Sequence, residues 1–316
     1  MKTPPNNPMK DLHRLLNKKD FQNQEELQAF LESLTGKPVP MIHPEDLSPQ
    51  EQAEDLAEEA MGLPPAQAKK KLEQALKLDP ESIPVYTILG RMESSPQAAL
   101  KYYEKAIAIG RKQFLGENAT TYMGHFWVMT ETRPFMRCMF EYAECLTALG
   151  TPEGLSRGFF VYEEMLTLNP NDNQGVRDQF MLMCLTFRRF DKFKHYAAQY
   201  NDGTAFAYFN KALFTFCLEG DTPTSRKELQ AAIKHNSFVT PMLTAPMRRI
   251  QPPASYSLGS KSEAEYYVMY AYLPWSSTPG AKEWLQANVG ASTGSDAPKT
   301  AKPTSAPKQT KAGKKK

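Results

Sequence analysis

Apolar residues in the central part of the chain recur with the spacing of amphipathic α-helices. Residues 134–170 are the clearest example, since they predict two amphipathic helices joined by a short turn and closed by Asn169-Pro170. A helix that packs against two neighbours needs small residues where backbones approach and large ones where it fills a gap. The second helix of this stretch follows that order at Gly158, Tyr162, Met165 and Leu168.

The same spacing occurs five times, beginning at residues 68, 99, 158, 193 and 225. The starting points are 31, 59, 35 and 32 residues apart, so three of the four intervals are similar. Internal repetition at such a period is typical of helical repeat proteins. The long interval predicts an insertion at about residues 110–133, which we interpret as an extended helix or a loop folded over the helices.

Several of these stretches resemble tetratricopeptide repeats. The resemblance is carried by Ala99, Tyr103, Ala106 and Ile109 in the second copy, by the closing tripeptides LDP and LNP, and by ALG before the turn of the third. It covers about residues 49–237 and implies an all-α fold, a right-handed α-solenoid of about five helix pairs with capping helices. The combination GHFW, ETRP and LNPNDNQGVR also resembles a block of uncharacterised bacterial tetratricopeptide proteins, which implies no activity.

The segments on either side of the repeats differ from them in composition. Residues 1–48 predict a helical segment followed by a proline-rich linker, and residues 238–289 predict helices that cap the end of the solenoid. Residues 290–316 contain mainly Ala, Ser, Thr, Pro and Lys with no large apolar residue, so they predict a disordered tail.

Charge is distributed unevenly along the chain. The net charge is +3, but residues 291–316 contain seven lysines and one acid, which leaves the rest of the chain at −3. The tail could attract nucleic acid without sequence selectivity, or it could only keep the protein soluble. The lysines proposed for nucleic-acid contact are Lys308, Lys311, Lys314, Lys315 and Lys316.

The sequence predicts no cofactor, no metal site and no catalytic residue. The four cysteines form no CxxC pair and lie in apolar helical stretches, which favours buried thiols in a reducing compartment. The segment 154–158 fits G-x-S-x-G, but that motif needs a strand before its serine, and both flanks here are helical. Without a signal peptide or an apolar run of about 18 residues, we expect a cytoplasmic protein with no membrane contact.

Candidate binding residues come from the first helix of each pair, which lines the concave groove of tetratricopeptide proteins. This reasoning selects Arg91, Arg137, Phe140 and Asn210, together with Glu144 and Phe214. Cations and amides beside aromatic rings suit an extended peptide, because they can bind its carbonyl or carboxylate groups. The alternative is that the two arginines are ordinary solvated residues.

Two further groups of candidate binding residues lie in and after the insertion. His125, Trp127 and Arg133, with Glu131, could bind an anion or an acidic peptide. Alternatively, the insertion only packs on the groove, with Glu131 pairing an arginine. Asn173 and Arg177 could contact a ligand, or the turn at 171–173 could simply cap the next helix.

These residues favour a non-enzymatic scaffold that binds a protein or peptide segment in the groove. A nucleic-acid- or ribosome-associated factor acting through the basic tail is the alternative. An enzyme using His125, Glu131 and Arg133 is a third hypothesis, motivated only by the clustering of polar groups.

Overall fold

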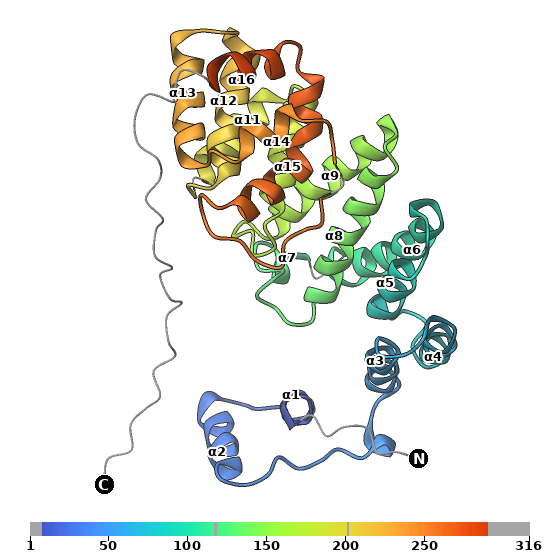
Figure 1. Ribbon diagram of the computed structural model, residues 1–316. Helices are drawn as coiled ribbons and strands as arrows, with labels where there is room; N and C mark the ends of the chain where they lie inside the picture. The colour runs from blue at the N-terminus through green and yellow to red at the C-terminus, as the bar shows by residue number, and fades with distance from the viewer. Residues whose placement is uncertain (1–7, 117–118, 201, 249, 290–316) are drawn as a thin grey trace. The chain divides into compact units, whose positions relative to one another are not determined.

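The computed structural model describes residues 8–116, 119–200, 202–248 and 250–289 (Figure 1). Within these residues the chain forms sixteen α-helices, one short 3-10 helix and no strand, so the all-α prediction is confirmed. The described residues divide into two compact units, one up to Val176 and the other from Arg177 onward. None of the described helices is both long and apolar enough to cross a membrane.

The helices of the first unit are α1 (Pro8–Lys18), α2 (Gln24–Leu34), η1 (Pro44–Asp46), α3 (Pro49–Ala60), α4 (Pro65–Leu78), α5 (Ile83–Arg91), α6 (Pro96–Phe114), α7 (Ala119–Tyr122), α8 (Arg133–Ala148) and α9 (Pro152–Leu168). Those of the second unit are α10 (Val176–Thr186), α11 (Phe190–Gln199), α12 (Ala205–Glu219), α13 (Pro223–His235), α14 (Val239–Thr244), α15 (Lys261–Ser277) and α16 (Ala281–Val289).

The second helices of three pairs begin with the same N-terminal cap. Ser95, Thr151 and Thr222 each accept a hydrogen bond from a backbone N–H of the first turn, and each is followed by proline. The hydroxyl accepts a hydrogen bond from an N–H that has no partner inside the helix. Proline is tolerated at the first helical position because the N–H that it lacks would have no partner there. The sequence therefore starts α6, α9 and α13 in the same way.

The repeated small and large positions are the buried faces of these second helices. Ala99, Tyr103, Ala106 and Ile109 are all buried on α6, and Gly158, Tyr162, Met165 and Leu168 are all buried on α9. In the first unit the pairs α3–α4, α5–α6 and α8–α9 pack in succession, since α3 contacts α5 and both α5 and α6 contact α8. The fourth pair is less regular, and Phe180 of α10 meets Tyr196 of α11 with ring centroids 4.8 Å apart.

Two glycines of the G-x-S-x-G segment are explained by helix packing. A Cβ at Gly154 would lie 2.5 Å from the carbonyl oxygen of Leu146, and one at Gly158 would lie 2.8 Å from Cγ2 of Thr147. Both positions face α8, whereas Ser156 between them is exposed. These glycines are there because α8 and α9 approach closely, and no strand precedes the serine.

Replacing Gly154 with alanine is expected to destabilise the first unit by about 1–3 kcal/mol, the usual range for overpacking. The neighbour is a backbone carbonyl inside α8, which cannot rotate away, so the clash should exceed the gain of roughly 1 kcal/mol that alanine brings to a helix. Chemical denaturation would measure the change. Gly62→Ala is the control, because its Cβ would meet nothing closer than 3.9 Å, and an equal loss in both variants would contradict this explanation.

In the second unit, the helices after residue 237 pack on the last repeat pair. α15 contacts α12, α16 contacts α13, and α14 contacts both α15 and α16. Glu263 near the start of α15 is completely buried and accepts hydrogen bonds from the backbone N–H of Ala205 at 2.8 Å and of Gly259 at 2.7 Å. It also accepts one from the side chain of Asn236 at 2.9 Å. One carboxylate therefore joins α12, the end of α13 and α15.

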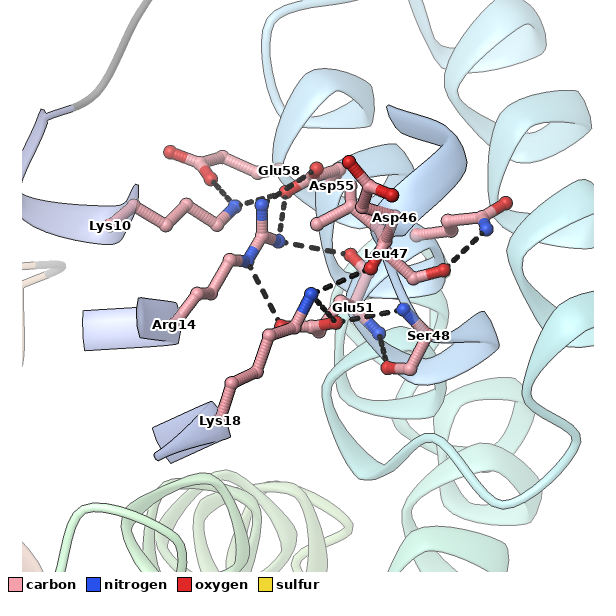
Figure 2. A network of polar contacts seen from close by, with 10 residues as sticks. Lys10, Arg14, Lys18, Asp46, Leu47, Ser48, Glu51, Asp55 and Glu58 are labelled. Carbon is pink, nitrogen blue, oxygen red and sulfur yellow. Dashed lines mark hydrogen bonds and ion pairs between the residues drawn. The ribbon is translucent and has the colours of Figure 1, made fainter. Parts of the chain in front are cut away.

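The N-terminal helix α1 is attached to α3 mainly by charge (Figure 2). The guanidinium of Arg14 donates to both carboxylate oxygens of Asp55, at 3.1 and 2.6 Å, and to the carbonyl of Glu51 at 3.1 Å. Lys10 pairs with Asp55 and Glu58, and Lys18 donates to the carbonyl of Asp46 at 2.6 Å. Basic residues spaced by four on α1 thus face acidic residues of α3, whose opposite face carries the buried alanines of the core.

This charged attachment is expected to weaken in acid. Burial alone would raise the pKa of Asp55, but hydrogen bonds from Arg14 and Lys10 outweigh it and hold that pKa below its ordinary value of 3.8. A lowered folded-state pKa stabilises docking above the ordinary value, and that contribution is lost as pH falls through the folded-state pKa. The protection of the α1 amides, measured relative to their intrinsic exchange rates, should therefore fall below about pH 4, with little change from pH 5 to 8.

Arg14→Ala gives the matching control for this experiment. It should raise exchange in α1 at neutral pH and remove most of its acid dependence, because the main partner of Asp55 is gone. Identical exchange profiles for the variant and the natural protein would contradict an electrostatic attachment.

Candidate peptide-binding surface

The predicted insertion between the second and third pairs is part helix and part loop: residues 110–114 continue α6, α7 follows, and residues 123–132 form a loop folded onto the first unit. Phe126 is fully buried there, with its ring centroid 5.9 Å from that of Tyr122 and 6.3 Å from that of Phe135. Its backbone N–H donates to the carbonyl of Leu168 at 3.4 Å. The buried hydroxyl of Thr132 donates back to the carbonyl of Phe126, so the loop closes at the start of α8.

The next residue along the loop, Trp127, lies half-buried beside the first turns of α8. The guanidinium carbon of Arg137 is 5.8 Å from its ring centroid, a distance typical of a cation–π contact. Arg133 is used differently, since it donates from Nε to the carbonyl of Trp127 at 2.8 Å and from Nη2 to that of Val128 at 3.3 Å. Arg133 therefore fixes the loop to the start of α8 through two hydrogen bonds, whereas the Arg137 side chain is exposed to solvent.

We call His125, Trp127, Val128 and Arg137 the Trp–Arg surface. His125 and Arg137 are exposed, and Val128 is 57% exposed although it is apolar. Within the described residues, no ion pair joins Arg137 to a carboxylate, and the expected pairing of Glu131 with an arginine is not found; Thr130 donates to Glu131 at 3.3 Å instead. The surface thus combines a cation, an aromatic ring and an uncovered aliphatic side chain.

Arg91 lies at the end of α5 and is paired inside the protein. Its guanidinium donates from Nε and Nη2 to the carboxylate of Glu141 on α8, and the hydroxyl of Tyr103 donates to the same carboxylate at 3.2 Å. Burial and the neighbouring Glu141 raise the pKa of Tyr103, so its hydroxyl stays protonated and remains a donor. The Arg91 side chain is 56% exposed, but its Nε and Nη2 donors are already used by Glu141, so a ligand carboxylate would compete with Glu141 for this pair of donors.

Phe140 and Glu144 turn toward the second helix of their own pair. The Phe140 ring centroid lies 6.4 Å from that of Tyr162 on α9, and the Tyr162 hydroxyl donates to the Glu144 carboxylate. Burial raises the pKa of Glu144, with the Tyr162 hydrogen bond opposing that effect. Both side chains contribute to the α8–α9 contact, and Phe140 stays half-buried at its edge.

Asn173 and Arg177 follow the third pair. Asp172, rather than Asn173, caps α10, because its carboxylate accepts a hydrogen bond from the N–H of Val176 at 2.7 Å. Asn173 is exposed. In the second unit Arg177 donates to Asp202 from Nε at 3.1 Å and from Nη2 at 2.5 Å, so it ties the start of α10 to the turn after α11.

Asn210 is completely buried in the second unit. Its side-chain oxygen accepts a hydrogen bond from the Tyr267 hydroxyl at 3.1 Å, and that hydroxyl accepts one from the indole of Trp275 at 2.8 Å. A peptide could contact Asn210 only if α15 moved away from α12. Phe214 packs instead on Phe193, with ring centroids 4.7 Å apart.

Sequence reasoning missed a hollow of about 370 Å³ in the second unit, between α11, α12 and α13. Lys194 and Lys211 lie at its wall with the Phe214 ring, and Lys211 pairs with Glu228 at 3.4 Å. The two lysines are 17 positions apart on helices of different pairs, so no local motif joins them. Lys194 and Lys211 come together only because α11 of the fourth pair lies beside α12 of the fifth.

The tail lysines Lys308, Lys311, Lys314, Lys315 and Lys316 lie outside the described residues. Among the described residues, no group of three or more His, Cys, Asp or Glu side chains could hold a metal ion. Comparisons with protein-family models, with curated proteins and with solved structures find no match to this chain.

Proposed function

We propose that the protein is a non-enzymatic scaffold of the tetratricopeptide type, in which five helix pairs form an α-solenoid that binds a peptide segment of a partner protein. The regular burial of the small and large repeat positions on α6 and α9 supports the repeat assignment. The succession of contacts from α3 to α5 to α8 supports a continuous row of first helices in the first unit.

The observation that carries the binding role is the contrast between Arg137 and the other selected arginines. Arg91 is paired with Glu141, Arg133 with two loop carbonyls, and Arg177 with Asp202. Arg137 contacts the ring of Trp127 and is exposed, and among the described residues no carboxylate pairs with it. A guanidinium already oriented by a ring loses little freedom when it binds, which favours recognition of a planar carboxylate.

The chemistry of the Trp–Arg surface suggests the kind of segment that fits. An Asp or Glu side chain, or a chain-terminal carboxylate, would accept hydrogen bonds from Arg137 in a bidentate manner. An apolar side chain next to it would cover Val128 and the edge of Trp127 and so remove apolar area from water. We therefore propose an extended acidic segment with an apolar residue beside its carboxylate.

Affinity purification from the native host with the natural protein and three variants as baits tests this proposal. Arg137→Glu and Trp127→Ala should each lose the partner retained by the natural protein, because one reverses the charge and the other removes its support. Lys70→Glu is the matched control, since Lys70 is an exposed cation on α4. Unchanged partners in both surface variants would refute the proposed site.

A nucleic-acid-associated role is the second candidate, favoured by the seven lysines of residues 291–316. Binding driven by counterion release weakens steeply with salt. Deleting residues 291–316 should then abolish binding to nucleic acid. If the full chain has no affinity for nucleic acid at low salt, this role is excluded, and the peptide-binding proposal is unaffected.

A further inference from the structure

The second unit contains a larger groove that the proposed peptide site does not use. Its volume is about 750 Å³, and it lies between α15 on one side and α14 with residues 245–248 and 250–251 on the other. One wall consists of residues at helical spacing on a single face of α15, namely Lys261, Glu265, Val268, Met269 and Tyr272. This wall extends over about 16 Å at the rise of an α-helix.

The lining of the groove is apolar and rich in methionine. Met242, Met247 and Met269 line it together with prolines, an alanine and Ile250, and Met247 is 68% exposed. Unbranched methionine side chains adapt to the shape of a partner and are common on surfaces that receive amphipathic helices. An exposed apolar lining of this kind is typical of a docking surface.

The charges at the groove are mainly positive. Arg248 and Lys261 lie at its edge, and the single acid there, Glu265, is paired with Lys261 at 3.5 Å. At the Tyr272 end, Lys282 lies with its ammonium 3.7 Å from the ring centroid. A helix that carries acidic residues around an apolar stripe would complement this arrangement.

The chain itself contains such a helix. α2, with the sequence QEELQAFLESL, has three glutamates and no cation, and none of its residues is buried. Leu27, Phe30, Leu31 and Leu34 form a stripe along one face, and Leu31 is 40% exposed. Its eleven residues span about 16 Å, which matches the length of the α15 wall.

We propose that this methionine-lined groove binds α2 of a second copy of the protein. The apolar stripe of α2 enters between α14 and α15, and its glutamates face Arg248, Lys261 and Lys282. Each copy then both donates a helix and offers a groove, so the contact produces a reciprocal dimer or a chain of copies. This inference does not depend on the proposed peptide-binding function.

A complementation experiment with full-length chains tests the proposal. The groove variant is Met247→Glu with Arg248→Glu, and the helix variant is Phe30→Glu with Leu31→Glu. The natural protein should increase in mass with concentration in analytical ultracentrifugation, while each variant alone stays monomeric. Mixing the two variants should restore a one-to-one complex, because one retains a working helix and the other a working groove.

Several outcomes would overturn the proposal. These are a natural protein that stays monomeric at high concentration, a variant that associates like the natural protein, and a mixture that forms no complex. If the helix variant misfolds, a labelled peptide of residues 20–36 replaces it as the probe. That peptide must bind the natural protein at least roughly tenfold more tightly than the groove variant, and equal affinity would refute the groove.

Discussion

Replacing Glu263 with alanine is expected to destabilise the second unit by about 3–5 kcal/mol. The carboxylate is fully buried and is the acceptor for the N–H of Ala205, the N–H of Gly259 and the side chain of Asn236. Each buried donor left without an acceptor costs about 1–3 kcal/mol. Ala205 and Asn236 are themselves buried, so water cannot easily replace the lost acceptor.

Thermal unfolding and amide exchange in α12 and α15 would measure this effect. Glu265→Ala is the matched control, two residues further along the same helix, where the carboxylate is partly exposed and pairs with Lys261 at 3.5 Å. It should change stability by less than about 0.5 kcal/mol. Similar losses in the two variants would show that the buried carboxylate does not hold the unit together.

Replacing Phe126 with alanine should have the second-largest effect, lowering the free energy of opening the insertion by about 3–5 kcal/mol. Phe126 is the fully buried anchor of the loop, enclosed by the rings of Tyr122 and Phe135. Without it, Trp127 would no longer be fixed beside Arg137. Partner capture should therefore fall even though both residues of the Trp–Arg contact are still present.

Amide exchange across residues 119–132, together with partner capture, would measure both consequences. Val128→Ala is the control for stability, since this neighbouring side chain is mostly exposed. It should leave exchange in the loop unchanged. An insertion equally protected in Phe126→Ala would mean that Phe126 does not anchor the loop.

The helix pattern could be predicted because it depends on residues close together in the sequence. The spacing of Ala99, Tyr103, Ala106 and Ile109 defines one face of a helix, and that face is buried. Caps such as Ser95 and Thr151 followed by proline mark where helices begin. The five stretches with this spacing begin on α4, α6, α9, α11 and α13, but the fourth fits poorly, since Tyr200 lies just after α11 and Ala197 is only half-buried.

The candidate site was less predictable because its contacts join distant residues. Spacing alone placed Arg91 on a groove face, but its partner Glu141 lies 50 positions away. Asn210 was selected on the same grounds, yet Tyr267 and Trp275 of the later helix α15 cover it. The residues next to Asn210 in the sequence do not indicate whether its side chain lines a groove or is covered by a later helix.

The insertion was predictable in one respect and not in another. Both interpretations of the insertion, an extended helix or a loop folded over the helices, implied packing, and Phe126 is buried. The sequence could not separate Arg133, which holds the loop through two carbonyls, from Arg137, which faces solvent. That distinction needs the path of the backbone from Trp127 to α8.

The most direct test of the central claim is a titration of the captured partner segment against the natural protein and Arg137→Glu. We expect Arg137→Glu to bind at least roughly tenfold more weakly, because a guanidinium–carboxylate attraction becomes a repulsion between two carboxylates. Lys70→Glu, with the same change in net charge, should bind like the natural protein. Equal affinity of the natural protein and Arg137→Glu would contradict the assignment of the Trp–Arg surface as the binding site.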